Sequence, residues 1–336
     1  MPTPPTPPLL YLDRRDVESL LPMEEAIERM AAAFGALARG DAVQPLRSAL
    51  WAGDRRGLLG TMPAHLDLPG GERLTGAKVV SVFPGNHAAG LETHLGFVLL
   101  FEAERGLPLA VVDAAAITAI RTAAVSGLAT RLLARADAAD LAILGSGVQA
   151  RTHLAALCAV RPVARVRVWS RDPESARRFA AAASAEHGIA VEAVASAEAT
   201  VAGADLVVTA TAARQPVLEG AWLAPGAHVN AVGSCTPDAR ELDGAAVARA
   251  RLFVDSRESA LAEAGDLLLA IAEGAVGEDH IQGELADLVI GRQAGRGGED
   301  EITLFESLGL GIEDLAAAHH VYVQALALEM GTPLER

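Results

Sequence analysis

The sequence predicts an α/β protein built around a doubly wound parallel sheet, and two observations lead to this expectation. First, the second half of the chain alternates short apolar runs with alanine-rich segments that favour helix, the pattern of repeated strand–helix–strand units. Second, 51% of the 336 residues are hydrophobic but only 4% are aromatic. Small aliphatic side chains therefore fill the core, which suits helices packed closely on a sheet.

The length and charge of the chain limit the classes of function. At roughly 150 residues per domain, the chain should form about two domains. It has 28 Lys and Arg against 43 Asp and Glu residues, which gives a formal net charge of −15. A chain this acidic is a poor candidate for binding nucleic acid or an anionic membrane. A local group of arginines can still bind a small anion.

The cysteines and the N-terminus give a second set of exclusions. Cys158 and Cys235 form neither a disulfide framework nor a metal-binding spacing, so we expect no metal. Met1–Leu10 is rich in proline and threonine and has no basic segment, which predicts a disordered leader rather than a signal peptide. No apolar run reaches the roughly 18 residues that cross a bilayer. We therefore expect a soluble protein of the reducing cytoplasm.

The first third of the chain predicts a mixed α+β region with antiparallel strands. Asp16–Arg39 has the apolar spacing of an amphipathic helix, with Pro22 starting its main body. The charged turn Glu104-Arg105-Gly106 separates the last two predicted strands, which therefore form a hairpin. The predicted strands are Leu58–Leu68, Gly76–Val82, Leu95–Glu102 and Pro108–Asp113.

From Thr118 onward the pattern changes to alternating helices and strands. Thr118–Ala136 predicts a helix, Gly291–Asp300 a loop, and Ile312–Glu329 a closing helix. The strands predicted between them are Leu141–Leu144, Val166–Trp169, Ile189–Val194, Asp205–Ala210, His228–Val232 and Leu252–Val254.

A glycine motif follows the first of these strands and predicts a dinucleotide site. Gly145-Ser146-Gly147-Val148-Gln149-Ala150 has the spacing GxGxxA between an apolar strand and a helix. Gly145 permits the tight turn, and Gly147 lets the backbone approach a pyrophosphate. Small Ala150 lets the helix pack on the strand, with its first amides facing the phosphates. The parallel sheet is therefore expected to be of the Rossmann type.

The end of the second strand distinguishes NADP from NAD. An NAD site places an acidic residue there to bind the ribose hydroxyls. Here that position holds Ser170, followed by Arg171, and this pair suits a 2′-phosphate by hydrogen bond and charge. We therefore expect NADPH, with NADH as the alternative because Asp172 could take the acidic role.

Three basic residues in apolar or glycine-rich surroundings predict an anion clamp. They are Arg47, Lys78 within a predicted strand, and Arg121 within a predicted helix. A single residue of this kind is usually a surface side chain whose charged end reaches water. Three such basic residues, which lie on separate elements before the nucleotide-binding domain in the sequence, are better explained as a binding site for the carboxylate of a substrate.

Six stretches of the sequence together match the motifs of one known family. They are Lys78–Asn86, Gly90–Gly96, Ile117–Ala124, Gly145–Ala150, Val232–Leu242 and Ile302–Gly309. The chain therefore resembles the ornithine cyclodeaminase/μ-crystallin family, and the likeness covers nearly all of it after the proline-rich leader. The resemblance implies a discontinuous α+β substrate and dimerisation domain, residues 1–128 with 311–336. It also implies an NAD(P)-binding domain over residues 129–310 and a homodimer.

The resemblance also implies roles for individual residues. Arg47, Lys78 and Arg121 match the positions that bind a substrate carboxylate, and Leu308 matches a position beside the substrate and the nicotinamide. We expect Lys78 also to be the catalytic group, because two nearby arginines would lower its pKa and let it give up a proton near neutral pH. Besides Gly145, Gly147 and Arg171, the cofactor set comprises Thr93, Arg121, Val148, Gln149, Ser170, Thr211, Val232 and Ser307.

At one position the chain departs from the family pattern, and the residue found there distinguishes the different activities of the family. Cyclodeaminases carry an aspartate where this chain has Cys235, and a buried thiol is a poor replacement for a carboxylate base. Asp238 lies three positions on and could substitute. The pattern Thr-Pro-Asp-Ala-Arg-Glu-Leu is more similar to the reductase and dehydrogenase members of the family.

The expected activity is reduction of a cyclic imino acid with NADPH. The substrates would be Δ1-pyrroline-2-carboxylate or Δ1-piperideine-2-carboxylate, and the products L-proline or L-pipecolate. Three alternatives stay open within the family: ornithine cyclodeamination, dehydrogenation of alanine or N-substituted amino acids, and NADPH binding without catalysis, as in crystallin-type members.

Overall fold

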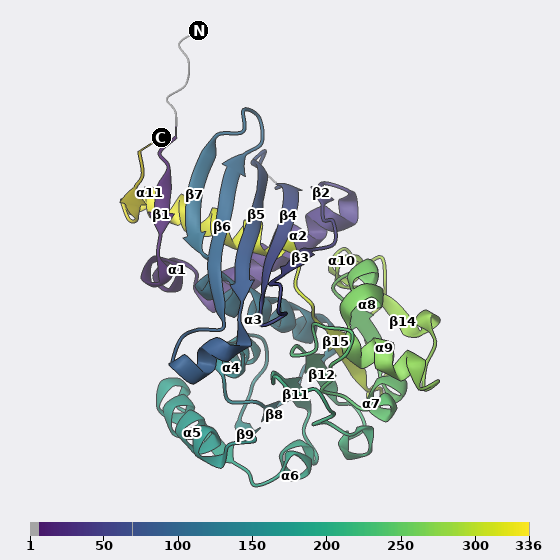
Figure 1. The fold of residues 1–336 in the computed structure, drawn as a ribbon. Coiled ribbons are helices and arrows are strands. Elements are labelled where there is room, and N and C mark those ends of the chain that lie inside the picture. Colours follow the sequence, from purple (N-terminus) through teal and green to yellow (C-terminus); the bar gives the residue numbers. More distant parts are fainter. Residues whose placement is uncertain (1–6, 69, 336) are drawn as a thin grey trace. The chain divides into compact units, whose positions relative to one another are not determined.

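The computed structural model describes residues 7–68 and 70–335, and the chain divides into two compact units (Figure 1). Unit 1 runs up to Arg121 and resumes at Leu310, whereas unit 2 spans Thr122–Gly309. We expected the divisions after residues 128 and 310, so the first boundary falls earlier, inside a long helix. Unit 1 is discontinuous in sequence.

Unit 1 is a mostly antiparallel sheet with helices on one face. The strand order is β16-β1-β7-β6-β5-β4-β2, and β3 pairs with β4. Helices α2 and α11 pack together, and α11 crosses strands β4 to β7 (Figure 1). The elements are β1 (Leu10–Leu12), α1 (Arg14–Leu20), α2 (Met23–Arg39), β2 (Ala42–Val43), β3 (Ser48–Trp51), β4 (Leu58–Asp67), β5 (Arg73–Val82), the 3-10 helix η1 (Pro84–Ala89), β6 (His94–Glu102), β7 (Pro108–Asp113), the first part of α3 (Ala114–Leu133), α11 (Gly311–Ala327) and β16 (Thr332–Pro333).

Unit 2 is the expected doubly wound parallel sheet. Its strand order is β10-β9-β8-β11-β12-β15-β13-β14, and the paired strands run parallel. The chain winds outward from β8 in one direction and then from β11 in the other, so the order reverses between β8 and β11. Besides the rest of α3, the elements are β8 (Asp140–Leu144), α4 (Val148–Val160), β9 (Arg165–Trp169), α5 (Pro173–His187), β10 (Ala190–Ala193), α6 (Ala197–Val201), β11 (Leu206–Thr209), η2 (Gly220–Trp222), β12 (His228–Ala231), α7 (Gly244–Arg249), β13 (Arg251–Val254), α8 (Arg257–Glu263), α9 (Gly265–Ala272), η3 (Glu278–His280), β14 (Ile281–Glu284), α10 (Leu285–Val289) and β15 (Thr303–Glu306).

The central strands of unit 2 are buried throughout. Every residue of β11, β12 and β15 is buried, as expected for a parallel sheet covered on both faces. Strand β15 lies between β12 and β13, although it is the last of them along the chain. We did not predict β15 as a strand, because four residues ending in a glutamate give a weak periodic signal.

The helix expected over Asp16–Arg39 is two helices, α1 and α2. Helix α1 ends at Leu20 with Leu21 as its C-cap, and Pro22 is the N-cap of α2. Proline has no backbone N–H, but at the start of a helix that N–H would have no partner within the helix, so Pro22 does not weaken α2. Helix α3 begins at Ala114 rather than Thr118, because the carboxylate of Asp113 accepts a hydrogen bond from the Ala116 N–H at 2.7 Å.

The leader predicted over Met1–Leu10 is wrong at its C-terminal end. Leu10 begins β1 and pairs with Ala110 of β7 and Pro333 of β16, and the Tyr322 hydroxyl donates to the Pro8 carbonyl at 3.0 Å. Residues 1–6 lie outside the described part of the chain. The hairpin predicted from Leu95 to Asp113 is confirmed as β6 and β7.

Candidate active site and dinucleotide site

A buried ion-pair cluster lies in unit 1 where β5 faces α11. Lys78 of β5 is in register with Met62 of β4 and Val98 of β6, both of which are buried. Residues opposite one another on neighbouring strands share a face of the sheet. Lys78 is therefore on the face that α11 covers, and it is only 3% exposed.

Two carboxylates of α11 hold the two predicted cations. The Lys78 ammonium lies 3.0 Å from Oδ2 and 3.1 Å from Oδ1 of Asp314. Arg121 donates from Nε to the same Oδ1 at 3.0 Å and from Nη1 to Glu313 Oε2 at 2.5 Å. The Lys78 cluster, as we call Lys78, Arg121, Glu313 and Asp314, thus contains two positive and two negative charges. Each buried charge has a partner, as charges of this kind require.

The environment lowers the pKa of Lys78 to about 8. Burial is the largest cause, because it disfavours the charged amine, and the positive charge of Arg121 adds to it. The carboxylate of Asp314 opposes both effects by stabilising the ammonium. An amine with this pKa exchanges a proton near neutral pH, which an ordinary lysine does not do readily.

Lys78 is also the single lysine of the chain, since the other basic residues counted with it are arginines. Arginine supplies charge and forked hydrogen bonds but does not lose its proton, whereas a lysine amine titrates once it is buried. Either a lysine or an arginine would form a structural ion pair at this position. The single lysine of the chain therefore occupies a position where an amine that can lose its proton is useful for catalysis.

Glu313 and Asp314 were not predicted as site residues. Both lie in the first turn of α11 and are fully buried. The available signal was two adjacent acids in an otherwise apolar helix start. Acidic residues are common there because they complement the helix dipole in solvent, so this signal does not distinguish a surface turn from a buried one.

Arg47 lies half-buried between β2 and β3. The side chain of Gln44, in the same segment, accepts a hydrogen bond from the Ile312 N–H at 3.1 Å. This segment therefore runs beside the start of α11, which carries Glu313 and Asp314. The role of Arg47 in substrate binding stays a prediction.

Thr93 precedes β6 in unit 1. Its hydroxyl lies 2.9 Å from Nδ1 of His94. Loss of solvation by the neighbouring protein, and then the positive charge of Lys78, lower the pKa of His94, which favours its neutral form near pH 7. The expected contact of Thr93 with the cofactor stays a prediction.

The glycine loop of unit 2 has the geometry that a pyrophosphate requires. Gly145 has a φ of 124°, and a Cβ there would overlap the carbonyl oxygen of Ala210. Gly147 caps α4 without a side-chain hydrogen bond to the first amides, and a Cβ on Gly147 would meet nothing within 4 Å. The first turn, with Val148 and Gln149, therefore presents backbone N–H groups to an anion.

The other predicted cofactor residues of unit 2 follow neighbouring strands at one edge of the sheet. Ser170 comes directly after β9, Val232 after β12 and Ser307 after β15, and Thr211 is the second residue after β11. The strands are parallel, so these residues gather at the carboxyl edge with the glycine loop after β8. Ligands of open α/β sheets bind at this edge, where the strand order reverses. The residues present thus fit a dinucleotide.

Asp172 has another role than ribose binding. Its carboxylate caps α5 by accepting from the N–H groups of Glu174 at 3.1 Å and Ser175 at 3.3 Å, and from the Ser175 hydroxyl at 2.6 Å. These hydrogen bonds lower the pKa of Asp172 and hold it against the helix start. The position after β9 therefore offers Ser170 and the exposed Arg171.

Leu308 and Cys235 occupy buried or half-buried positions in unit 2. The Leu308 N–H donates to Asp255 Oδ2 at 2.6 Å, and the Cys235 thiol lies 3.5 Å from the Val232 carbonyl oxygen. Asp238, the residue that could replace a catalytic aspartate, is exposed and ion-paired with Arg214. Its carboxylate is engaged at the surface of unit 2.

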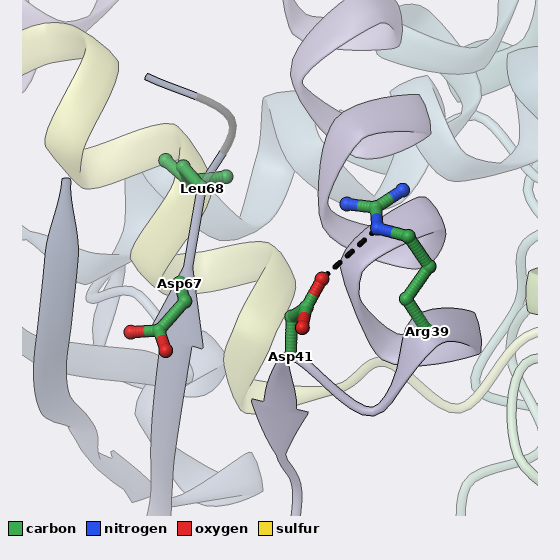
Figure 2. Close-up of a pocket in the computed structure, with 4 residues that line it drawn as sticks. All are labelled: Arg39, Asp41, Asp67 and Leu68. Carbon is green, nitrogen blue, oxygen red and sulfur yellow. Dashed lines mark hydrogen bonds and ion pairs between the residues drawn. The ribbon is translucent and has the colours of Figure 1, made fainter. Parts of the chain in front are cut away.

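A surface pocket of unit 1 contains none of the predicted site residues. Figure 2 shows its lining, where the Arg39 guanidinium points at Asp41 and donates at 2.9 Å, next to Asp67 and Leu68. Asp67 is ion-paired with Arg73 at 3.2 Å. Because these charges neutralise one another, we assign no ligand to this pocket.

In residues 7–68 and 70–335, no three His, Cys, Asp or Glu side chains are grouped so that they could hold a metal ion. In the same residues, no helix combines the length and the apolar character needed to cross a membrane.

The parallel sheet of unit 2 and its glycine loop define a Rossmann-type dinucleotide-binding protein. The chain belongs to the ornithine cyclodeaminase/mu-crystallin family, whose model matches residues 10–329. The resemblance stated from the sequence motifs is thereby confirmed.

Three similar proteins illustrate the relationship. The ketimine reductase mu-crystallin of Mus musculus is 39% identical over 296 residues, which cover 88% of this chain and 90% of that protein. The structure of Thermococcus litoralis Δ1-pyrroline-2-carboxylate reductase with NADH and L-proline has a TM-score of 0.93 and 41% identity, covering 97% of this chain and 100% of that chain. An archaeal alanine dehydrogenase dimer with bound NAD has a TM-score of 0.91 and 34% identity, covering 97% and 99%.

Proposed function

We propose that this protein reduces cyclic imino acids with a nicotinamide cofactor, converting Δ1-pyrroline-2-carboxylate to L-proline and Δ1-piperideine-2-carboxylate to L-pipecolate. The observation that carries the proposal is the buried amine of Lys78, with a pKa of about 8, beside the guanidinium of Arg121. The named activities of the mouse and Thermococcus relatives, ketimine and pyrroline-2-carboxylate reduction, support the same chemistry.

Arg47 and Arg121 would bind the substrate carboxylate, and Lys78 would protonate the imine nitrogen. A cyclic imine becomes electrophilic at carbon when its nitrogen is protonated, so the proton transfer prepares the carbon for reduction. The bound nicotinamide supplies the hydride that this carbon accepts, and the former Lys78 proton stays on the product amine. Asp314 holds the Lys78 ammonium in place until the proton is transferred.

The cofactor would be held by the residues at the carboxyl edge of unit 2. The glycine loop, with Gly145 and Gly147, and the first turn of α4 would bind the pyrophosphate. Thr211, Val232 and Ser307 would line the rest of the site, and Leu308 would lie beside the nicotinamide. Thr93 and Arg121 complete the set predicted from the sequence.

Ornithine cyclodeamination is the alternative with a distinct chemical requirement, a carboxylate base in the loop after β12. Cys235 occupies the expected aspartate position, and Asp238 is paired with Arg214 at the surface. These contacts favour the reductase. Purified protein with NADPH and either imine should consume the cofactor, whereas ornithine should give neither proline nor ammonia. Failure with both ring sizes, or proline from ornithine with catalytic NAD, would overturn the proposal.

NADPH is the proposed cofactor, although the two solved relatives above contain NADH and NAD. The capping role of Asp172 supports this choice, because it leaves Ser170 and Arg171 to receive a 2′-phosphate. Ser170→Asp should lower the ratio of kcat/KM for NADPH to that for NADH by at least about tenfold, since it places a negative charge against the phosphate.

The matched control for this prediction is Arg177→Ala. Arg177 is an exposed arginine of the nearby helix α5 and is paired with Glu174, so its loss should leave the cofactor ratio unchanged. Arg171→Ala should lower the ratio without improving use of NADH. Equal ratios for wild type, Ser170→Asp and Arg171→Ala would contradict the predicted preference.

A homodimer is the proposed assembly, with the uncovered sheet face of unit 1 as the interface. Residues on this face alternate with the buried row of Lys78, and they include Leu50, Leu59, Leu95 and Phe97, which are 71%, 43%, 46% and 45% exposed. Contiguous exposed apolar side chains of this kind mark protein interfaces. The archaeal alanine dehydrogenase, a dimer, supports a second copy as the occupant.

Leu50→Glu should convert the dimer to a monomer in sedimentation velocity, because it would bury a charge in the interface. Leu328→Glu is the control, since Leu328 is 60% exposed at the end of α11 and off this face. A monomeric wild type, or equal dissociation by both variants, would refute this interface. Neither cysteine forms a disulfide, and we propose that the enzyme works in the reducing cytoplasm.

A further inference from the structure

The carboxylate of Glu241 joins the ends of two strands in unit 2. Its Oε1 accepts hydrogen bonds from both the N–H and the hydroxyl of Thr211, each at 2.6 Å. Its Oε2 accepts from the Gly233 N–H at 2.7 Å. Glu241 is completely buried, and Thr211 and Gly233 are the second residues after the neighbouring strands β11 and β12.

These strand ends are in direct contact with the glycine loop. A Cβ on Gly233 would overlap the Thr211 carbonyl oxygen and would lie 2.6 Å from the carboxyl carbon of Glu241. A Cβ on Gly145 would overlap the Ala210 carbonyl oxygen and would lie 3.6 Å from the Thr211 methyl carbon. The packing therefore leaves no space along the series Gly145, Thr211, Gly233 and Glu241. A shift of Glu241 is transmitted through these contacts to the glycine loop.

Glu241 is itself held by a second buried carboxylate. Oδ1 of Asp266 accepts from the backbone N–H groups of Glu241 at 2.8 Å and Leu242 at 2.7 Å. Further along the same edge, Asp255 Oδ2 accepts from the N–H groups of Leu308 at 2.6 Å and Gly309 at 2.7 Å. Carboxylates thus fix the backbone after β11, β12 and β15.

We infer that Glu241 is a positioning residue for the dinucleotide, acting through Thr211 and Gly233 to hold the strand ends against the glycine loop. This inference rests on the proposed cofactor binding. No role for Glu241 follows from the hydride transfer itself, because its side chain is occupied by three hydrogen bonds within the protein. Its contribution is the geometry of the site before the cofactor binds.

A comparable carboxylate at the opposite edge of the same sheet separates positioning from general stability. Asp205 directly precedes β11 and accepts hydrogen bonds from the N–H groups of Ala139 and Asp140, both at 3.0 Å. It also pairs with Arg135 at 2.5 Å. Asp205 therefore joins backbone segments as Glu241 does, but at the amino edge, away from the predicted cofactor residues.

The test compares Glu241→Gln with Asp205→Asn by fluorescence titration of NADPH and NADH, with the thermal midpoint of each variant measured in parallel. Glutamine keeps one acceptor oxygen and turns an amide group toward a backbone N–H, so one arm of the connection is lost. Glu241→Gln should raise the Kd of the cofactor at least tenfold well below its Tm. Asp205→Asn should lower Tm and leave the Kd within twofold of wild type.

A second pair of variants covers the case in which Glu241→Gln does not fold. Asp266→Ala removes the acceptor that holds the Glu241 and Leu242 N–H groups and should raise the Kd severalfold, whereas Asp266→Asn keeps Oδ1 as an acceptor and should raise it less than twofold. A wild-type Kd in Glu241→Gln, or equal Kd values for Asp266→Ala and Asp266→Asn, would overturn the inference. Absence of binding by the wild-type protein would instead refute the proposed function.

Discussion

Lys78→Ala is expected to lower kcat for the reduction of Δ1-pyrroline-2-carboxylate by about a thousandfold, the typical contribution of a positioned general acid. The side chain is buried within hydrogen-bond distance of Asp314, and the chain has no second lysine to supply the proton. Steady-state kinetics give kcat, and fluorescence titration should show an unchanged Kd for NADPH. Retained turnover in a folded variant would refute the role of Lys78.

Lys78→Arg separates charge from proton transfer. The guanidinium keeps the positive charge beside Asp314 but cannot donate a proton near neutral pH. We expect kcat to fall nearly as far as in the alanine variant. A variant with arginine and near wild-type kcat would mean that Lys78 acts only as a charge.

The pH dependence of the wild type follows from the same group. Since Lys78 donates a proton, activity requires the ammonium form and should fall as pH rises through about 8, the pKa that burial and Arg121 impose. Because the chain has one lysine, NMR of protein labelled with 15N at the lysine side chain gives a single side-chain signal for titration. A midpoint near the ordinary value of 10.5 would contradict the burial argument.

Asp314→Asn is the second change with a large expected effect. It leaves Lys78 and Arg121 buried with only Glu313 to balance them, and removal of one partner from a buried pair typically costs about 3–5 kcal/mol of stability. It also removes the carboxylate that raises the pKa of Lys78, so the alkaline limb of the pH–rate profile should move below pH 8. Denaturant unfolding and the pH–rate profile measure the two effects.

Asp67→Asn is the matched control for this prediction. Asp67 is a β4 aspartate, partly exposed and paired with Arg73 and His65 at the surface of unit 1. Exposed pairs contribute only about 0–1 kcal/mol, so this variant should keep both its stability and its pH–rate profile. If Asp314→Asn behaves like Asp67→Asn, the Lys78 cluster is not a coupled unit.

The parts of the fold that were predicted correctly have local signals. The glycine motif is complete within six residues, and Ser170 was recognised by its position after the second strand of the sheet. Thr211 and Val232 were assigned through the family resemblance, because no local pattern identifies them. The partners of Lys78 have no such signal. Asp314 is 236 residues away along the chain, and only the return of α11 to the first sheet brings it to β5.

Glu241 and β15 show the same limit in unit 2. Glu241 is one acid among 43 in the sequence, and its role depends on three hydrogen bonds that exist only when β11 and β12 are neighbours. Strand β15 joins the sheet between β12 and β13, far from its place in the sequence. Tertiary pairing decides both features, and local propensity does not encode it.

Isotope transfer tests the central claim most directly. Purified protein should be mixed with NADPH carrying deuterium at the transferable C4 position and with Δ1-pyrroline-2-carboxylate, and the product examined by mass spectrometry. Imine reduction predicts L-proline with one deuterium at C2 and one NADPH oxidised per proline formed. Proline without deuterium, or no NADPH oxidation with either ring size, would contradict the account.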